Sequence, residues 1–213
     1  MRSAATVVVL RDGPAGVETL LVRRSPDSRT FAGAWVFPGG AVEPADGDPS
    51  DTDAVRRAAV RELREETGLV LPPESLRAWS CWIPPSEAPV QVRTWFFLAV
   101  APAQPVTVDG LEITEHAWLT GERALTEHGE GLRALMPPTW MTLHDLRRLR
   151  TVEEVLVRTN REPPTYHATV TRTAAGTELV WGSPRSARLR IDRLPWQLLS
   201  TSAVPSPEGI RPS

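Results

Sequence analysis

The stretch Arg61-Glu62-Leu63-Arg64-Glu65-Glu66-Thr67-Gly68-Leu69 decides the fold of this 213-residue chain. It closes a run, Asp53–Thr67, that lacks glycine and proline and is rich in alanine, arginine and glutamate, so a helix is predicted that ends at Gly68. Residues three and four apart share a helix face, which places three carboxylates together: those of Glu62, Glu65 and Glu66. Neighbouring carboxylates repel each other unless a cation lies among them, and hard oxygen ligands select Mg²⁺ or Mn²⁺. The alternative is a solvated helix face whose charges pair with one another, such as Arg61 with Glu65.

A second segment, Phe37-Pro38-Gly39-Gly40, precedes the predicted helix. Proline fixes φ, and the two glycines that follow allow the backbone to approach a ligand closely. Downstream, Gly68 occupies the position where a left-handed residue ends many helices. The three carboxylates are therefore flanked by a glycine-rich turn upstream and a helix-ending glycine downstream.

Together these segments resemble the Nudix hydrolases. The box of that family is a glycine, five residues, a glutamate, seven residues, then Arg-Glu-apolar-x-Glu-Glu-x-Gly-apolar. Residues 61–69 match every specified position of the second half, but the first half departs from the pattern. Pairing Gly40 with Asp46 keeps the glycine-rich turn and leaves an inserted loop before Arg61, whereas pairing Gly47 with Asp53 keeps the spacing and loses the turn. We prefer Gly40 with Asp46; in both alignments an aspartate replaces the glutamate.

The resemblance implies an α/β/α Nudix sandwich with a mixed sheet over residues 1–160, followed by a C-terminal extension, residues 161–213, with a hairpin and a loose tail. It also implies a Mg²⁺ or Mn²⁺ site whose ligands are Glu62, Glu65 and Glu66. The segment Leu111–Leu119 resembles a family segment that supplies an extra ligand or base in some members. The implied catalytic residues are Glu65, Arg61, Glu112 and Glu115. A bound metal would offset the charge of a diphosphate and organise a water, while a carboxylate accepts the proton of that water.

The run from Leu20 to Gly40 resembles the signature of coenzyme A diphosphatases: Leu-Leu-Thr-x-Arg-Ser/Ala, three residues, Arg, three, Gly, three, Phe-Pro-Gly-Gly. Every specified position matches except Val22, where threonine is expected. The resemblance implies cleavage of coenzyme A or acyl-CoA to 3′,5′-ADP and 4′-phosphopantetheine or its acyl form. The implied substrate contacts are Arg24, Ser25, Arg29, Phe37, Gly39 and Gly40. Arg24 and Arg29 suit a substrate with an additional 3′-phosphate, because a guanidinium group binds phosphate through two hydrogen bonds.

Other functions remain open at this point. The same chemistry could act on another nucleoside diphosphate derivative, such as ADP-ribose, a nucleotide sugar or NADH. A catalytically silent Nudix module that senses a nucleotide is a further alternative. Phe31 and Trp35 could stack on adenine, although a core or loop-anchoring role is commoner for aromatic residues.

The remaining periodicities place the predicted box in an α+β or mixed α/β domain. Apolar and β-branched runs predict five strands: Thr6–Leu10, Thr19–Arg23, Leu76–Trp82, Val92–Val100 and Ile113–Leu119. Leucines every three positions predict a late helix over Trp140–Arg150. A hairpin is predicted from Tyr166–Arg172 and Thr177–Trp181, with a loose tail from about Ser202.

Composition excludes several other functions. All 24 basic residues are arginine, which removes chemistry that needs a lysine amine, such as Schiff-base catalysis and the P-loop. Cys81 is the single cysteine, so an intramolecular disulfide is excluded and a reducing cytoplasm is expected. A net charge of −2 gives no reason to expect a nucleic-acid partner, and no apolar run is long enough to span a membrane. The expected partner is a small CoA-like nucleotide, with a homodimer as the candidate assembly.

Overall fold

The computed structural model describes residues 1–159, 162–182 and 186–202. Its elements follow one another as β1 (Arg2–Gly13), β2 (Gly16–Arg24), β3 (Trp35–Val36), β4 (Gly39–Ala41), α1 (Thr52–Thr67), the 3₁₀ turn η1 (Pro73–Ser75), β5 (Arg77–Ile83), β6 (Val92–Val100), β7 (Ile113–Thr120), α2 (Gly121–Gly129), α3 (Pro137–Leu146), α4 (Val152–Val157), β8 (Thr165–Thr173), β9 (Gly176–Trp181), β10 (Ser186–Arg190) and β11 (Gln197–Ser202).

One mixed sheet runs through the molecule in the order β11-β10-β9-β8-β5-β6-β1-β2-β3, with β4 paired to β1 and β7 paired to β2. β1 and β6 are parallel along Arg2–Leu10, whereas β1 and β2 are antiparallel. The first half of β1 also pairs with β4, so the glycine-rich segment is paired directly with a central strand. The predicted α+β class with a mixed sheet is confirmed.

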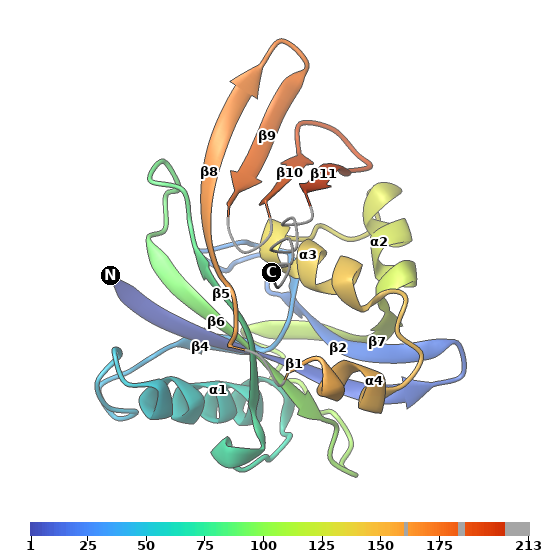
Figure 1. Ribbon diagram of the computed structural model, residues 1–213. Helices are drawn as coiled ribbons and strands as arrows, with labels where there is room; N and C mark the ends of the chain where they lie inside the picture. The colour runs from blue at the N-terminus through green and yellow to red at the C-terminus, as the bar shows by residue number, and fades with distance from the viewer. Residues whose placement is uncertain (160–161, 183–185, 203–213) are drawn as a thin grey trace, which may run out of the picture.

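Helices cover both faces of this sheet (Figure 1), and the alternation of side chains along β1 explains why. Val7 and Val9 belong to the core on the α1 side, together with Val55, Ala59 and Leu63 of that helix. Val8 and Leu10 belong to the opposite core, together with Trp140 and Leu143 of α3 and Val155 of α4. Both faces of β1 are therefore buried, as its continuous apolar run requires.

Both ends of α1 follow from local sequence. The side chain of Asp51 caps the N-terminus by accepting a hydrogen bond from the backbone N–H of Asp53, and Gly68 ends the helix with φ 71°. The helix starts at Thr52, one residue before the predicted start, and ends at Thr67 as predicted.

The late helix differs from its prediction. α3 begins at Pro137, because proline is favourable in the first helical turn, and it ends at Leu146 rather than Arg150.

The helix α2 was not predicted from the sequence. It is short and begins and ends with glycine, which hides its periodicity. Its N-terminus is capped by Thr120, whose hydroxyl accepts a hydrogen bond from the N–H of Arg123.

The C-terminal extension shares the sheet and core of the rest of the chain. β8 and β9 form the predicted hairpin around Ala175-Gly176, and β8 also pairs in parallel with β5. Trp82 of β5 packs against Tyr166 and Trp181, with ring centroids 4.6 and 5.3 Å away. The boundary at residue 160 stays a prediction, and the predicted tail beyond Ser202 lies outside the described residues.

None of the described helices is long and apolar enough to cross a membrane.

Candidate active site

The segment Phe37–Gly40 forms a rigid turn beside the end of α1. The Thr6 hydroxyl lies within hydrogen-bond distance of the carbonyl oxygens of Phe37 and Pro38, at 3.0 and 2.8 Å. Gly39 has φ 155°, and a Cβ there would lie 2.2 Å from the carbonyl oxygen of Ala5. A Cβ on Gly40 would lie 2.4 Å from the carboxyl carbon of Glu62. Two consecutive glycines are therefore required for the turn to touch the acidic face of α1.

Glu66 is the buried centre of that acidic face. It is 3% exposed, and its Oε2 accepts a 2.8 Å hydrogen bond from the backbone N–H of Gly39. Burial raises the pKa of Glu66 to about 8, and the neighbouring Glu62 charge adds to this, against the Gly39 hydrogen bond and the Arg24 charge. Burial also raises the pKa of Glu62, although the hydrogen bond from Arg61 opposes it. The two carboxylates are desolvated and repel each other, so a cation between them would be strongly stabilised.

Arg61 connects the helix to the preceding loop. Its Nε and Nη2 donate to the two carboxylate oxygens of Asp46 at 3.1 and 2.9 Å, and its Nη1 donates to Glu62 at 2.8 Å and to Glu65 at 3.0 Å. Burial acts to raise the pKa of Asp46, but the hydrogen bonds from Arg61 and from the N–H of Glu43 outweigh it and hold this pKa below its ordinary value. Asp53 is exposed in the first turn of α1. The structure thus pairs Asp46, and not Asp53, with the arginine of the motif.

Glu65 lies at the edge of this group, with its side chain half exposed. Within residues 1–159, 162–182 and 186–202, no three His, Cys, Asp or Glu side chains converge closely enough to form a ready-made metal cluster. The donor chemistry nevertheless fits Mg²⁺ or Mn²⁺, because Glu62 and Glu66 offer hard oxygens in a desolvated, negatively charged setting. Gly40 leaves the space in front of Glu62 free of a side chain.

The comparisons with known proteins agree with this geometry. A sequence model of the NUDIX domain matches residues 1–157. The chain belongs to the Nudix family. The family acts on diphosphate bonds and generally uses divalent metal ions. The resemblance seen in the sequence is confirmed at this level, whereas the coenzyme A branch is not shown.

Individual relatives cover parts of this Nudix chain. A 69-residue stretch is 41% identical to a probable nudix hydrolase of Schizosaccharomyces pombe, covering 32% of this chain and 22% of the relative. A 75-residue stretch is 41% identical to an uncharacterized Nudix hydrolase, NudL, of Klebsiella aerogenes, covering 35% of this chain and 54% of the relative. The matches thus span about half or less of each relative's length. The crystal structure of a NUDIX hydrolase from Alicyclobacillus acidocaldarius superposes with a TM-score of 0.67 at 26% identity, covering 76% of this chain and 98% of that one.

Two further predicted residues of the Nudix domain, Arg24 and Glu112, lie near the acidic face. Nη1 of Arg24 lies 4.0 Å from Oε1 of Glu66, and its Nε donates to the carbonyl oxygen of Thr30 at 3.1 Å. Glu112 contributes to the raised pKa of Glu66, after burial and Glu62, and its carbonyl oxygen accepts a 2.7 Å hydrogen bond from the N–H of Ser25. Ser25 is buried, and this bond joins the residue that follows β2 to the residue that precedes β7.

Three predicted site residues lie elsewhere. Phe37 is 2% exposed and packs edge-on against Phe96 in the core, so its side chain supports the turn from behind. Arg29 is exposed and makes no hydrogen bond or ion pair with the described part of the chain. Glu115 forms an ion pair with Arg23 at 2.5 Å, away from the carboxylates of α1.

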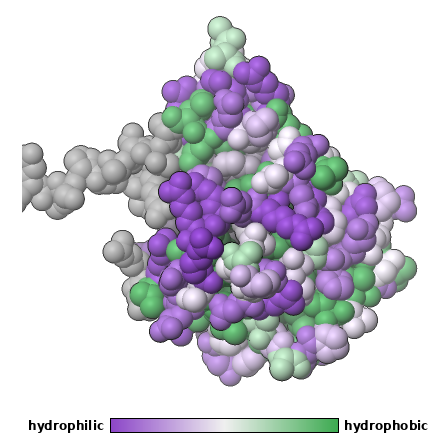
Figure 2. All heavy atoms as spheres, turned by 90° about the vertical axis from the view of Figure 1, so that its right-hand side faces the viewer, coloured by the Kyte–Doolittle hydropathy of each residue, from purple (hydrophilic) through white to green (hydrophobic). Residues whose placement is uncertain are grey.

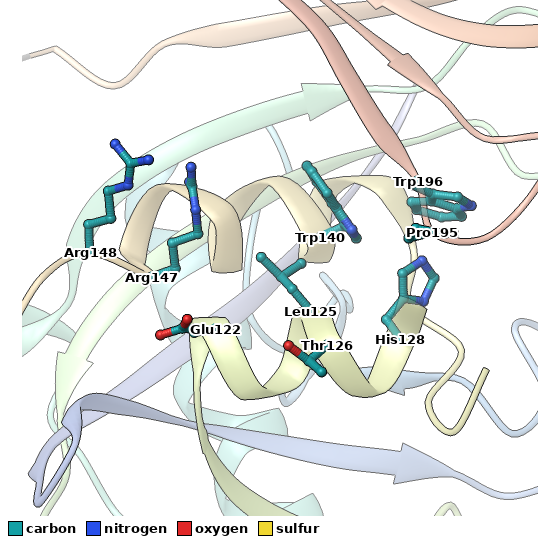
Figure 3. Close-up of a pocket in the computed structure, with 9 residues that line it drawn as sticks. All are labelled: Glu122, Leu125, Thr126, His128, Trp140, Arg147, Arg148, Pro195 and Trp196. Atoms are coloured by element: carbon teal, nitrogen blue, oxygen red, sulfur yellow. The ribbon is translucent and has the colours of Figure 1, made fainter. Parts of the chain in front are cut away.

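A cavity of about 420 Å³ lies between α2, α3 and the segment Pro195–Trp196 (Figure 3). Two of its lining residues, His128 and Trp196, pack edge-on with ring centroids 4.5 Å apart, and a third, Trp140, stacks on the neighbouring His144. Burial lowers the pKa of His128. None of the predicted site residues lines this cavity, so it belongs to the helical layer and not to the acidic face.

The sequence did not reveal two residues that support the segments around the site, one bonded to the Phe37–Gly40 turn and one packed on Trp35. Thr6 was read only as the start of a strand, because a threonine in a strand carries no signal that it binds a distant turn. Arg133 follows α2, which was itself missed, yet its guanidinium lies 3.8 Å from the ring centroid of Trp35. Trp35 is therefore a buried anchor, whereas Phe31 is 45% exposed and has φ 54°.

Proposed function

We propose that this Nudix domain is a metal-dependent hydrolase that cleaves the diphosphate of coenzyme A or acyl-CoA to 3′,5′-ADP and 4′-phosphopantetheine or its acyl form. The observation that supports hydrolysis is the contact between the Gly39 N–H and the buried Glu66, beside Glu62. The choice of coenzyme A is supported by the Leu20–Gly40 signature, whose last residues form this contact.

Each group has a proposed role in the reaction. Glu62, Glu65 and Glu66 would hold Mg²⁺ or Mn²⁺, which when bound offsets the diphosphate charge and makes water more acidic. Arg61 acts as a positioning residue, because its Nη1 bonds both Glu62 and Glu65 while Asp46 holds its other side. Glu112 is the preferred acceptor for the proton of the attacking water, since it lies near Glu66, whereas the carboxylate of Glu115 is already taken by Arg23.

The proposed substrate contacts follow the geometry of the turn. The turn backbone at Gly39 and Gly40 faces the diphosphate, and Arg24 beside Glu66 contacts one of its phosphates. Arg29, exposed on the loop between β2 and β3, reaches the diphosphate from the solvent side. A cytoplasmic location and a homodimeric assembly complete the proposal.

A substrate panel tests this function. The purified chain is incubated with CoA, acetyl-CoA, ADP-ribose, NADH and a nucleotide sugar, each with Mg²⁺, Mn²⁺ or EDTA, and the products are identified by mass spectrometry. We expect metal-dependent release of 3′,5′-ADP and 4′-phosphopantetheine, with the highest kcat/KM for CoA or its thioester. A higher kcat/KM for ADP-ribose, NADH or the sugar nucleotide would overturn the choice of coenzyme A.

A further inference from the structure

A second cleft, of about 490 Å³, lies next to the edge of the sheet. We call it the Arg133 cleft. Its charged walls are two arginines and two glutamates from four segments of the chain: Arg23 of β2, Glu115 of β7, Glu127 of α2 and Arg133 of the segment that follows. Figure 2, which views the molecule from the side of α2 and β7, shows hydrophilic residues gathered over the middle of this face.

The Arg133 cleft and the acidic face lie on opposite sides of the same strands. Successive side chains of a strand point to opposite faces, and Arg24 lies beside Glu66 while Arg23 lines the cleft. In β3, the edge strand, Trp35 lines the cleft, and the chain continues within four residues to Gly39, which bonds Glu66. The acidic face and the Arg133 cleft therefore lie on the two sides of the short strand β3 and the end of β2.

The far wall of the cleft is fixed to this edge strand. The N–H of Trp35 donates to the carbonyl oxygen of Ala134 at 2.8 Å, and Trp35 forms an isolated parallel bridge with Leu135. The guanidinium of Arg133 lies over the Trp35 ring, and Nδ1 of His128 is 2.9 Å from the carbonyl oxygen of Arg133. The wall is thus held by backbone and side-chain bonds before any ligand arrives.

The cations of the cleft have unused hydrogen-bonding capacity. Nε of Arg23 and Nη1 of Arg133 are buried and have no hydrogen-bond partner among the described residues. Glu127 is bonded by both Arg123 and Arg133, and Glu115 by Arg23. The cleft walls hold two arginines and two glutamates, so its attraction for an anion rests on the guanidinium N–H groups that the glutamates leave unsatisfied. Guanidinium groups held in place by carboxylates are suited to phosphate, and buried donors without acceptors are costly to keep.

We propose that the Arg133 cleft binds a phosphate group on the ribose of the substrate, separate from the diphosphate that is cleaved. This inference rests on the proposed function and names the part of the substrate that the cleft selects. The pantetheine half carries no anion, so the unsatisfied guanidinium donors of the cleft suit the nucleotide half. Arg23 and Arg133 contact the phosphate, and the carboxylates of Glu115 and Glu127 orient the two guanidinium groups.

The test is isothermal titration with adenosine 3′,5′-bisphosphate and with AMP, which lacks the second phosphate, each in Mg²⁺. A charge-assisted hydrogen bond corresponds to roughly a ten- to hundredfold change in affinity. We expect the wild type to bind the bisphosphate at least ~10-fold more tightly than AMP, and Arg133→Gln to abolish this preference. Arg23→Gln provides the same readout if Arg133→Gln does not fold. The matched control is Arg123→Gln, because Arg123 bonds the same Glu127 but does not line the cleft, and it should keep the preference.

Two outcomes would overturn the inference: no preference in the wild type, or a preference that survives in both Arg23→Gln and Arg133→Gln. A purely structural role for these arginines would lower the melting temperature without changing the ratio of the two affinities. Turnover separates the inference from the proposed function. Cleavage of CoA and dephospho-CoA with equal kcat/KM contradicts the cleft alone, whereas cleavage of neither contradicts the function.

Discussion

At the scale of single residues, Asp46 is the chain's main departure from the Nudix pattern. Its side chain is one carbon shorter than glutamate, yet both oxygens bond Arg61, because the loop before α1 brings the backbone of residue 46 close to the helix. The Nε of Arg57 also donates to the Asp46 carbonyl oxygen at 2.8 Å, which fixes that position. The shorter acid therefore keeps the contact with the arginine.

Asp46→Asn should lower the free energy of unfolding by about 1.5–3 kcal/mol, the scale of a hydrogen bond to a charged group. The folded-state pKa of Asp46 lies below its ordinary value, so the stability it contributes is full above the unfolded value of 3.8 and is lost as pH falls below that value. Urea unfolding between pH 7 and pH 3 measures both effects. A variant as stable as the wild type at pH 7 would show that the ion pair contributes nothing.

Arg24→Ala should lower kcat/KM by roughly ten- to a hundredfold if, as we propose, the guanidinium beside Glu66 contacts the diphosphate itself. The loss should be equal for CoA and dephospho-CoA, since both contain that diphosphate. Steady-state kinetics with the two substrates checks this expectation. A loss confined to CoA would instead place Arg24 at the ribose phosphate.

At the scale of elements, the ends of the inserted loop contribute more to the stability of the fold than its middle does. Residues 47–50 are exposed, and Asp51 caps α1. Replacing residues 47–50 with two glycines should change the free energy of unfolding by less than about 1 kcal/mol, because loop-closure entropy varies slowly with length. The matched variant Asp51→Ala should cost about 1 kcal/mol through loss of the cap. Thermal unfolding compares the two, and a larger loss from the loop would mean that the Ser3 contact to Pro49 matters more than the cap.

The sequence predicted the elements whose signals are local. α1 carries its own cap, acidic face and terminal glycine, so its existence, its bounds and the grouping of Glu62 and Glu66 were predictable. α2 was not, because its glycine ends and shortness leave no period to detect. The position of Arg61 between Asp46 and Glu65 depends on a turn that periodicity does not describe. The Arg133 cleft joins residues more than a hundred positions apart, and no spacing in the sequence encodes that contact.

At the scale of the whole molecule, the C-terminal extension completes the core. Tyr166, Ala168, Leu179 and Trp181 are buried in the cluster that also contains Trp82 and Leu143. Ending the chain at residue 159 would expose Trp82 and leave β5 without its partner β8. We expect the truncated chain to lose its cooperative thermal transition, because removing buried aromatic residues costs about 3–5 kcal/mol each. An unchanged melting temperature would instead make residue 160 a true domain boundary.

In the proposed function, the buried carboxylates held by the Gly39–Gly40 turn carry out diphosphate hydrolysis. The most direct measurement is kcat of Glu66→Gln with CoA at saturating Mg²⁺, beside Glu153→Gln, an exposed glutamate of α4, as control. Glu66→Gln removes an anionic ligand while keeping the side chain's shape, so kcat should fall by at least ~10²-fold with the fold intact, and the control should match the wild type. Wild-type kcat in a folded Glu66→Gln variant would contradict the assignment of this site.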